Sequence, residues 1–62
     1  MEVVYRERTW SFDESMTVKQ MLKRIDILPE SALVVRDGKL VTEDQLLKPG
    51  DAVKVVDAIS GG

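Results

Sequence analysis

Two residue types with much of the chemistry of active sites are missing from this sequence of 62 residues. It has no cysteine and no histidine, which excludes a disulfide, a thiolate nucleophile, an imidazole base and the side-chain ligands that zinc prefers. We therefore expect no catalytic residue, no metal site and no bound cofactor. Secreted domains of this size usually need disulfides, so their absence favours the reducing cytoplasm.

Clustered positive charge and long apolar runs are also absent. Nine basic and eleven acidic residues give a net charge of −2, without the concentrated basic patch that nucleic acids require. The longest apolar stretches, such as residues 32–35, are far shorter than the ~20 residues of a transmembrane helix, and the acidic start lacks the basic region of a signal peptide. We expect a cytoplasmic protein that binds neither nucleic acid nor membranes and is monomeric when free.

The length leaves room for one small domain. A chain of this size buries only about 60% of the surface that it exposes when unfolded, so nearly every large apolar side chain must join one core. Little remains to line a substrate pocket, and three aromatic residues add little more. The sequence therefore favours a protein that is not an enzyme.

Hydrophobic periodicity predicts four elements in the order hairpin, helix, hairpin and strand. Residues 1–6 and 8–12 alternate apolar and polar positions, which predicts two strands joined by a short turn. Residues 32–36 and 39–41 flank Asp37-Gly38, the strongest short hairpin signal. The last strand is predicted over residues 52–58, after a type II turn with Pro and Gly at its centre.

The helix is predicted from residue 17 onward. The helical spacing i, i+3, i+4, i+7 places four apolar groups on one stripe: Val18, Met21, Leu22 and Ile25. Thr17 is the expected N-cap, and Gln20 three residues later completes a capping box. Pro29 is expected to stop the helix, with the residue before it extended.

These elements predict a two-layer α+β fold, because one helical stripe has only one sheet face available to bury it. Strand alternation divides the sheet residues between two faces. The predicted face toward the helix holds Val3, Tyr5, Leu33, Val35, Val53 and Val55. The predicted outer face holds Val4, Arg6, Val34, Arg36, Lys54 and Val56.

Motifs along the whole chain resemble the β-grasp, or ubiquitin-like, superfamily, and within it the small sulfur carriers of the ThiS/MoaD type. The residues that carry the resemblance are Thr17-Val18, the run from Leu33 to Gly38, Leu47-x-Pro49-Gly50-Asp51-x-Val53 and the terminal Ser60-Gly61-Gly62. The resemblance implies a mixed sheet of four to five strands with one helix across one face, and parallel pairing of the last strand with the first. It also implies a domain over residues 1–58 and a flexible tail over residues 59–62.

The resemblance further implies a function for the two final glycines. A partner of the ubiquitin-activating type, an adenylyltransferase, would use ATP to couple the Gly62 carboxylate to AMP. A persulfide on a sulfur-donor protein would displace AMP and leave a thiocarboxylate, and a synthase would accept the sulfur for thiamine thiazole, molybdopterin or tRNA thiolation. Because glycine has no Cβ, Gly61 and Gly62 can pass a narrow channel and approach a nucleotide. The chain would then be a carrier and not a catalyst.

Such a tail needs an anchoring surface, because the entropy lost on ordering it must be offset by contacts elsewhere. The predicted outer face is the candidate partner-binding surface, since an apolar centre with a charged rim suits transient docking. It comprises Val4, Val34, Val56, Arg6, Arg36 and Lys54, with Ile59 and Ser60 beside it. An ordinary exposed sheet surface explains the same pattern equally well.

Two other functions share parts of this pattern. A ubiquitin-like modifier would transfer the activated Gly62 carboxyl to lysines of other proteins, leaving Gly-Gly remnants on them, whereas a sulfur carrier gains a sulfur atom. A passive binding module would use the sheet surface alone and would not need Gly61 and Gly62. Two terminal glycines arise by chance in about one chain in 200, which favours a function for them.

Overall fold

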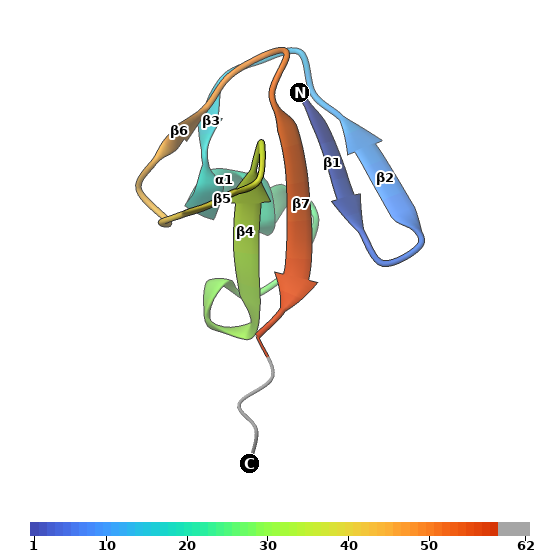
Figure 1. Ribbon diagram of the computed structural model, residues 1–62, viewed down its shortest axis with the longest axis vertical. Helices are drawn as coiled ribbons and strands as arrows, with labels where there is room; N and C mark the ends of the chain where they lie inside the picture. Colours follow the sequence, from blue (N-terminus) through green and yellow to red (C-terminus); the bar gives the residue numbers. More distant parts are fainter. Residues whose placement is uncertain (59–62) are drawn as a thin grey trace.

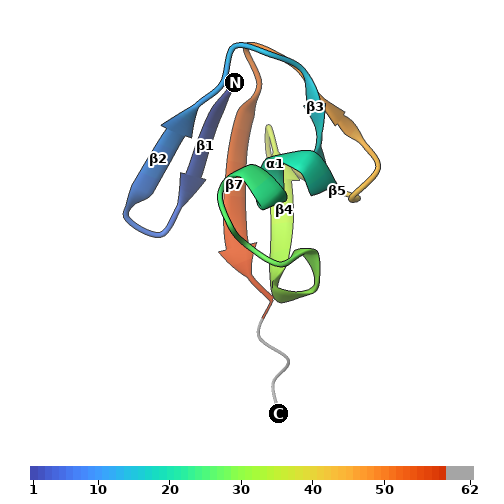
Figure 2. The same ribbon diagram turned by 180° about the vertical axis from the view of Figure 1, so that it is seen from behind.

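The computed structural model describes residues 1–58, and the predicted tail over residues 59–62 lies outside the described residues. The main sheet has five strands in the order β2-β1-β7-β4-β5 (Figure 1). In chain order these strands are β1 (Glu2–Tyr5), β2 (Arg8–Ser11), β4 (Ala32–Arg36), β5 (Lys39–Val41) and β7 (Ala52–Asp57). Helix α1 (Val18–Arg24) covers one face, as the view from behind shows (Figure 2). Two short strands, β3 (Met16–Thr17) and β6 (Leu46–Leu47), pair beside the helix.

Two antiparallel hairpins supply the outer strands of the sheet, as the sequence predicted. In the second hairpin Asp37 and Gly38 both have positive φ, 51° and 85°, which is the pattern of a type I′ turn. In the first hairpin only Arg6 has positive φ, 56°, as at the first position of a type II′ turn. The first turn therefore uses a left-handed arginine where glycine is usual.

Strand β7 lies at the centre of the sheet and holds its two halves together. It pairs in parallel with β1, with Val53 opposite Val3, and antiparallel with β4, with Val55 opposite Val34. The predicted parallel pairing of the first and last strands is confirmed. Both edges of β7 are hydrogen-bonded, so the final strand of the domain is also one of its most constrained elements.

The start of α1 is as predicted, but its end is not. The Gln20 N–H donates to Thr17 Oγ1 at 3.1 Å, and the Thr17 N–H donates to Gln20 Oε1 at 2.9 Å, which completes the capping box. The helix ends at Arg24, and Asp26 then takes a left-handed φ of 63°. Aspartate tolerates this conformation, which commonly closes a helix. Pro29 does not stop α1; it begins the 3₁₀ helix η1 (Pro29–Ser31).

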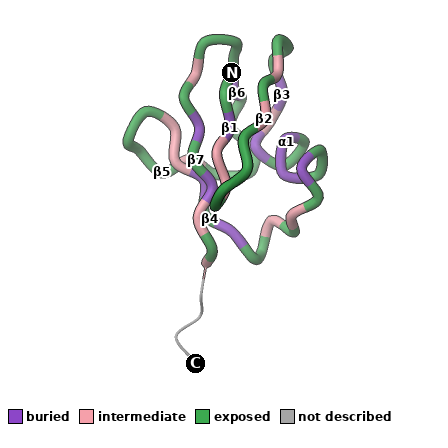
Figure 3. Tube along the Cα trace, turned by 90° about the vertical axis from the view of Figure 1, so that its right-hand side faces the viewer, coloured by how far each residue is buried: buried purple, intermediate pink, exposed green. Residues whose placement is uncertain are grey.

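The core lies between α1 and the inner face of the sheet (Figure 3). Its most deeply buried side chains come from α1, from β1 and β7 of the main sheet, and from β6 of the small sheet. Each is less than 2% exposed: Met21, Leu22, Leu47, Val3, Val18 and Val55. A single apolar cluster is thus shared by α1 and by strands of both sheets, as the length of the chain requires.

The predicted assignment of faces is wrong for β4. Val34 is 3% exposed and sits in the core, whereas Leu33 is 47% exposed. Directly opposed residues of paired strands share a face, and Val34 opposes the buried Val55. Arg36 has the same parity as Val34 and opposes the buried Val53, so it also lies on the helix side. Three successive apolar residues, 33–35, fit either face, so alternation could not decide between them.

We expect Val34→Ala to lower the free energy of unfolding by about 2 kcal/mol, because it removes buried methyl groups and leaves a cavity. The matched variant on the same strand, Leu33→Ala, should cost less than half as much, because its side chain is nearly half exposed. Urea unfolding of both variants measures the difference. A larger loss for Leu33→Ala would contradict the observed register.

Candidate functional site

The site is defined by the end of β7, where the chain leaves the sheet toward residue 59. This end lies on the same side of the molecule as the β1–β2 turn and η1 (Figure 1). The Ala58 N–H donates to the Ser31 carbonyl at the end of η1, at 3.0 Å. The last described residue is therefore fixed by a backbone hydrogen bond to the segment that precedes β4.

Side chains from both ends of the domain meet at this point. The Tyr5 hydroxyl donates to Asp57 Oδ1 at 2.7 Å. Arg6 donates to Asp57 Oδ2 through Nη2 at 2.8 Å and through Nε at 3.2 Å. The Arg6 guanidinium carbon also lies 5.1 Å from the centroid of the Tyr5 ring, a cation–π contact. We call these three residues the exit cluster.

The exit cluster shifts the pKa values of its own members. The hydrogen bond from Tyr5, followed by those from Arg6, holds the pKa of Asp57 below its ordinary value of 3.8. The bond to Asp57 raises the pKa of the Tyr5 hydroxyl above its ordinary value of 10.0, and raises that of Arg6 as well. Asp57 is thus a carboxylate at neutral pH, and it accepts hydrogen bonds from both neighbours.

The outer face of the sheet carries two shallow depressions beside the exit cluster. One of about 300 Å³ is lined by Val4, Lys54, Val56 and the exit cluster. The other, of about 470 Å³, also includes Val4 and Lys54 and continues toward Val35. The two share residues, so they form one surface along β1, β7 and β4.

Three of the predicted partner-binding residues share this outer face: Val4, Lys54 and Val56. Arg6 lies at its edge, where its side chain is bonded to Asp57 but still 67% exposed. The sequence prediction missed Leu33 and Val35, which the register of β4 places here opposite Val56 and Lys54. We define these five residues as the outer patch: Val4, Leu33, Val35, Lys54 and Val56.

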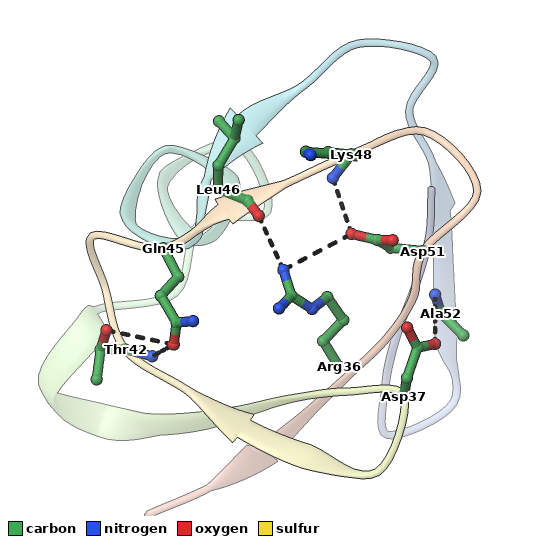
Figure 4. A network of polar contacts seen from close by, with 8 residues as sticks. All are labelled: Arg36, Asp37, Thr42, Gln45, Leu46, Lys48, Asp51 and Ala52. Atoms are coloured by element: carbon green, nitrogen blue, oxygen red, sulfur yellow. Dashed lines mark hydrogen bonds and ion pairs between the residues drawn. The ribbon is translucent and has the colours of Figure 1, made fainter.

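Val34 and Arg36 are not part of the outer patch, which corrects the prediction. Val34 is in the core. Arg36 Nη1 donates to the Leu46 carbonyl at 2.9 Å and lies 4.0 Å from Asp51 Oδ2, on the helix side of the sheet (Figure 4). Asp51 also accepts a hydrogen bond from the Lys48 N–H at 2.8 Å across the turn before β7. Arg36 therefore ties β4 to β6 and to this turn.

The remaining predicted site residues, Ile59, Ser60, Gly61 and Gly62, lie outside the described residues. Among residues 1–58, no three acidic side chains gather in a way that could hold a metal ion. No helix in this range is long and apolar enough to cross a membrane.

The fold and the position of the exit define a class of protein. A mixed sheet with its first and last strands parallel, and a helix across one face, is the β-grasp arrangement of ubiquitin-like proteins. The chain is similar to a thiamine biosynthesis protein (ThiS) from Geobacter metallireducens, known from its crystal structure. The match has a TM-score of 0.70 and 23% identity and covers 100% of both chains, and at this identity it shows the fold.

The family model described as "ThiS family" matches residues 1–62, the whole chain. This protein belongs to the ThiS family of small sulfur carriers.

The exit cluster predicts a pH dependence of stability. The pKa of Asp57 is lower in the folded state than in the unfolded chain, so the unfolded chain takes up the proton first as the pH falls. The stabilisation by Asp57 is complete above the ordinary aspartate pKa and is lost as the pH falls through the lower, folded value. We therefore expect Asp57→Asn to lower the melting temperature only slightly at pH 7, because water screens the exposed cluster, and to have a still smaller effect near pH 2. Melting curves at both pH values test this, and an equal effect at both would contradict it.

Proposed function

We propose that this protein carries sulfur as a thiocarboxylate on Gly62 in thiamine biosynthesis. The observation that carries the proposal is the family match over the whole chain, which includes Gly61 and Gly62. The name of the Geobacter metallireducens protein, a thiamine biosynthesis protein, supports the thiazole of thiamine as the destination of the sulfur. The chain acts as substrate and carrier in the cytoplasm, and its partners supply the catalysis.

The chemistry explains why a carrier needs an activating partner. A carboxylate is a poor electrophile, because attack on it gathers negative charge on one carbon. An adenylyltransferase of the ubiquitin-activating type overcomes this by joining the Gly62 carboxylate to the α-phosphate of ATP, with pyrophosphate as the leaving group. The terminal sulfur of a persulfide on the donor protein then attacks the acyl carbon and displaces AMP. A thiol cleaves the remaining S–S bond, and the thiocarboxylate delivers sulfur to the accepting synthase.

The outer patch is our proposed docking surface for the adenylyltransferase, with Ile59 and Ser60 making contacts beside it. It supports the proposal by its position, because the depression at Val4, Lys54 and Val56 directly adjoins Asp57 at the end of β7. Four extended residues after Ala58 reach at most about 14 Å. A partner that binds the Gly62 carboxylate must therefore approach this end of the sheet, where the apolar patch and its exposed lysine are available to it.

Removal of Gly61 and Gly62 tests the proposed function. With the purified adenylyltransferase of the same organism, the full chain should support exchange of pyrophosphate into ATP, and the truncated chain should reduce this exchange to the background rate. The melting temperature should not change, because the deletion lies beyond β7. Undiminished exchange by the truncated chain, or none by the full chain, would contradict the proposal.

Charge reversal on the outer patch tests the docking surface. We expect Lys54→Glu combined with Val56→Asp to raise the KM for the carrier about tenfold or more, since loss of contacts at an interface centre weakens binding by this order. Lys54→Glu alone, at an exposed residue, should raise the KM with no loss of folding. The matched control is Lys19→Glu on α1, an exposed lysine on the other layer. Equal KM values for Lys54→Glu and Lys19→Glu would exclude this surface.

A further inference from the structure

The end of β7 is held from two directions. On the β4 side, the Ala58 N–H is bonded to the Ser31 carbonyl at 3.0 Å. On the β1 side, the carboxylate of Asp57 is bonded by Tyr5 and Arg6. The chain direction at Ala58 is therefore fixed by one backbone bond and by one side-chain cluster, immediately before the residues that contain the proposed reactive end.

The exit cluster is more than a single surface ion pair. Its bonds join residues 51 and 52 positions apart in the sequence, and each carboxylate oxygen of Asp57 has its own donor. Arg6 reaches Asp57 from a backbone position with φ 56°, a conformation that L-residues other than Asn, Asp and Gly seldom adopt. The Tyr5 ring packs against the same guanidinium. Three hydrogen bonds thus fix one carboxylate, and the cation–π contact holds its two donor residues against each other.

Stability alone is a weak explanation for this arrangement. The side chains of Arg6 and Asp57 are 67% and 34% exposed, and ion pairs in such positions contribute little to folding because water screens them. The same bonds do fix the orientation of the end of β7, because bonds from two directions restrict how a strand end moves even when their net energy is small.

We propose that Tyr5, Arg6 and Asp57 form a positioning clamp that sets the direction in which the chain leaves β7, and so places the Gly62 carboxylate at the nucleotide of the adenylyltransferase. This inference rests on the proposed function. The three residues act through the chain at Ala58 and do not touch the reacting atoms. Arg6 then serves the end of β7 and not the rim of the docking surface to which the sequence assigned it.

The expected effect follows from geometry. Misplacement of a reacting group by about 1 Å can slow a reaction ~100-fold. A loosened strand end moves the origin of the tail and lowers the fraction of bound carriers whose carboxylate meets the nucleotide. The outer patch is unchanged, so binding is unchanged. Loss of the clamp should therefore lower kcat and leave KM nearly the same.

The test compares Asp57→Asn, Tyr5→Phe and the double variant in the pyrophosphate exchange assay. Tyr5→Phe removes the hydroxyl that lies 2.7 Å from Asp57 and keeps the ring, and Asp57→Asn keeps the size of the side chain but removes its charge. We expect the double variant to lower kcat about tenfold with KM within about twofold of the unmodified chain. The matched control is Glu14→Gln, which breaks the exposed ion pair of Glu14 with Arg24, 2.6 Å long, between the β2–β3 loop and α1.

The kcat and KM values of these variants show whether the three residues act as a positioning clamp. A fall in kcat for the clamp variants, with Glu14→Gln unaffected, supports it. An unchanged kcat overturns it. If KM rises while kcat is unchanged, the three residues form a docking contact instead. Faster hydrogen exchange at the Ala58 amide in the double variant, with an intact fold, is also required. Failure of the unmodified chain to support any exchange would instead contradict the proposed function.

Discussion

Strand β7 is hydrogen-bonded along both of its edges, and among the described residues the two hairpins of the main sheet are joined only through it. The final strand runs between β1 and β4, and its inward side chains, Val53 and Val55, lie in the core. Strand β7 stays paired with β4 as far as Asp57, and the Ala58 N–H then bonds to the Ser31 carbonyl. The described chain therefore leaves the sheet at Ala58 from its central strand, at one defined end.

The two faces of this sheet differ in burial. The inner face and α1 use almost all the large apolar side chains to build one small core. The outer face keeps several apolar residues of β1, β4 and β7 half-buried or exposed, next to the end of β7. A domain of this size has no spare volume for an enclosed site. The proposed docking surface is accordingly an open face of the sheet and not an enclosed pocket.

Local signals in the sequence predicted most of the fold. Thr17 with Gln20 indicated the helix start, and Asp37-Gly38 indicated the second hairpin, because both depend on residues close together in the chain. The faces of β4 could not be predicted, since three apolar residues in succession satisfy either register and the pairing with β7 decides. The end of α1 was missed because a left-handed Asp26 gives a weaker signal than Pro29. The exit cluster joins residues 52 positions apart, so no local pattern could reveal Tyr5 as a partner of Asp57.

We propose that this fold presents the Gly62 carboxylate for replacement of one oxygen by sulfur. The most direct measurement is the intact mass of the full chain after incubation with the adenylyltransferase, ATP and a persulfide donor. We expect replacement of one oxygen by sulfur, located at Gly62 by fragmentation. A chain whose mass stays unchanged, or whose added sulfur lies at another residue, would contradict it.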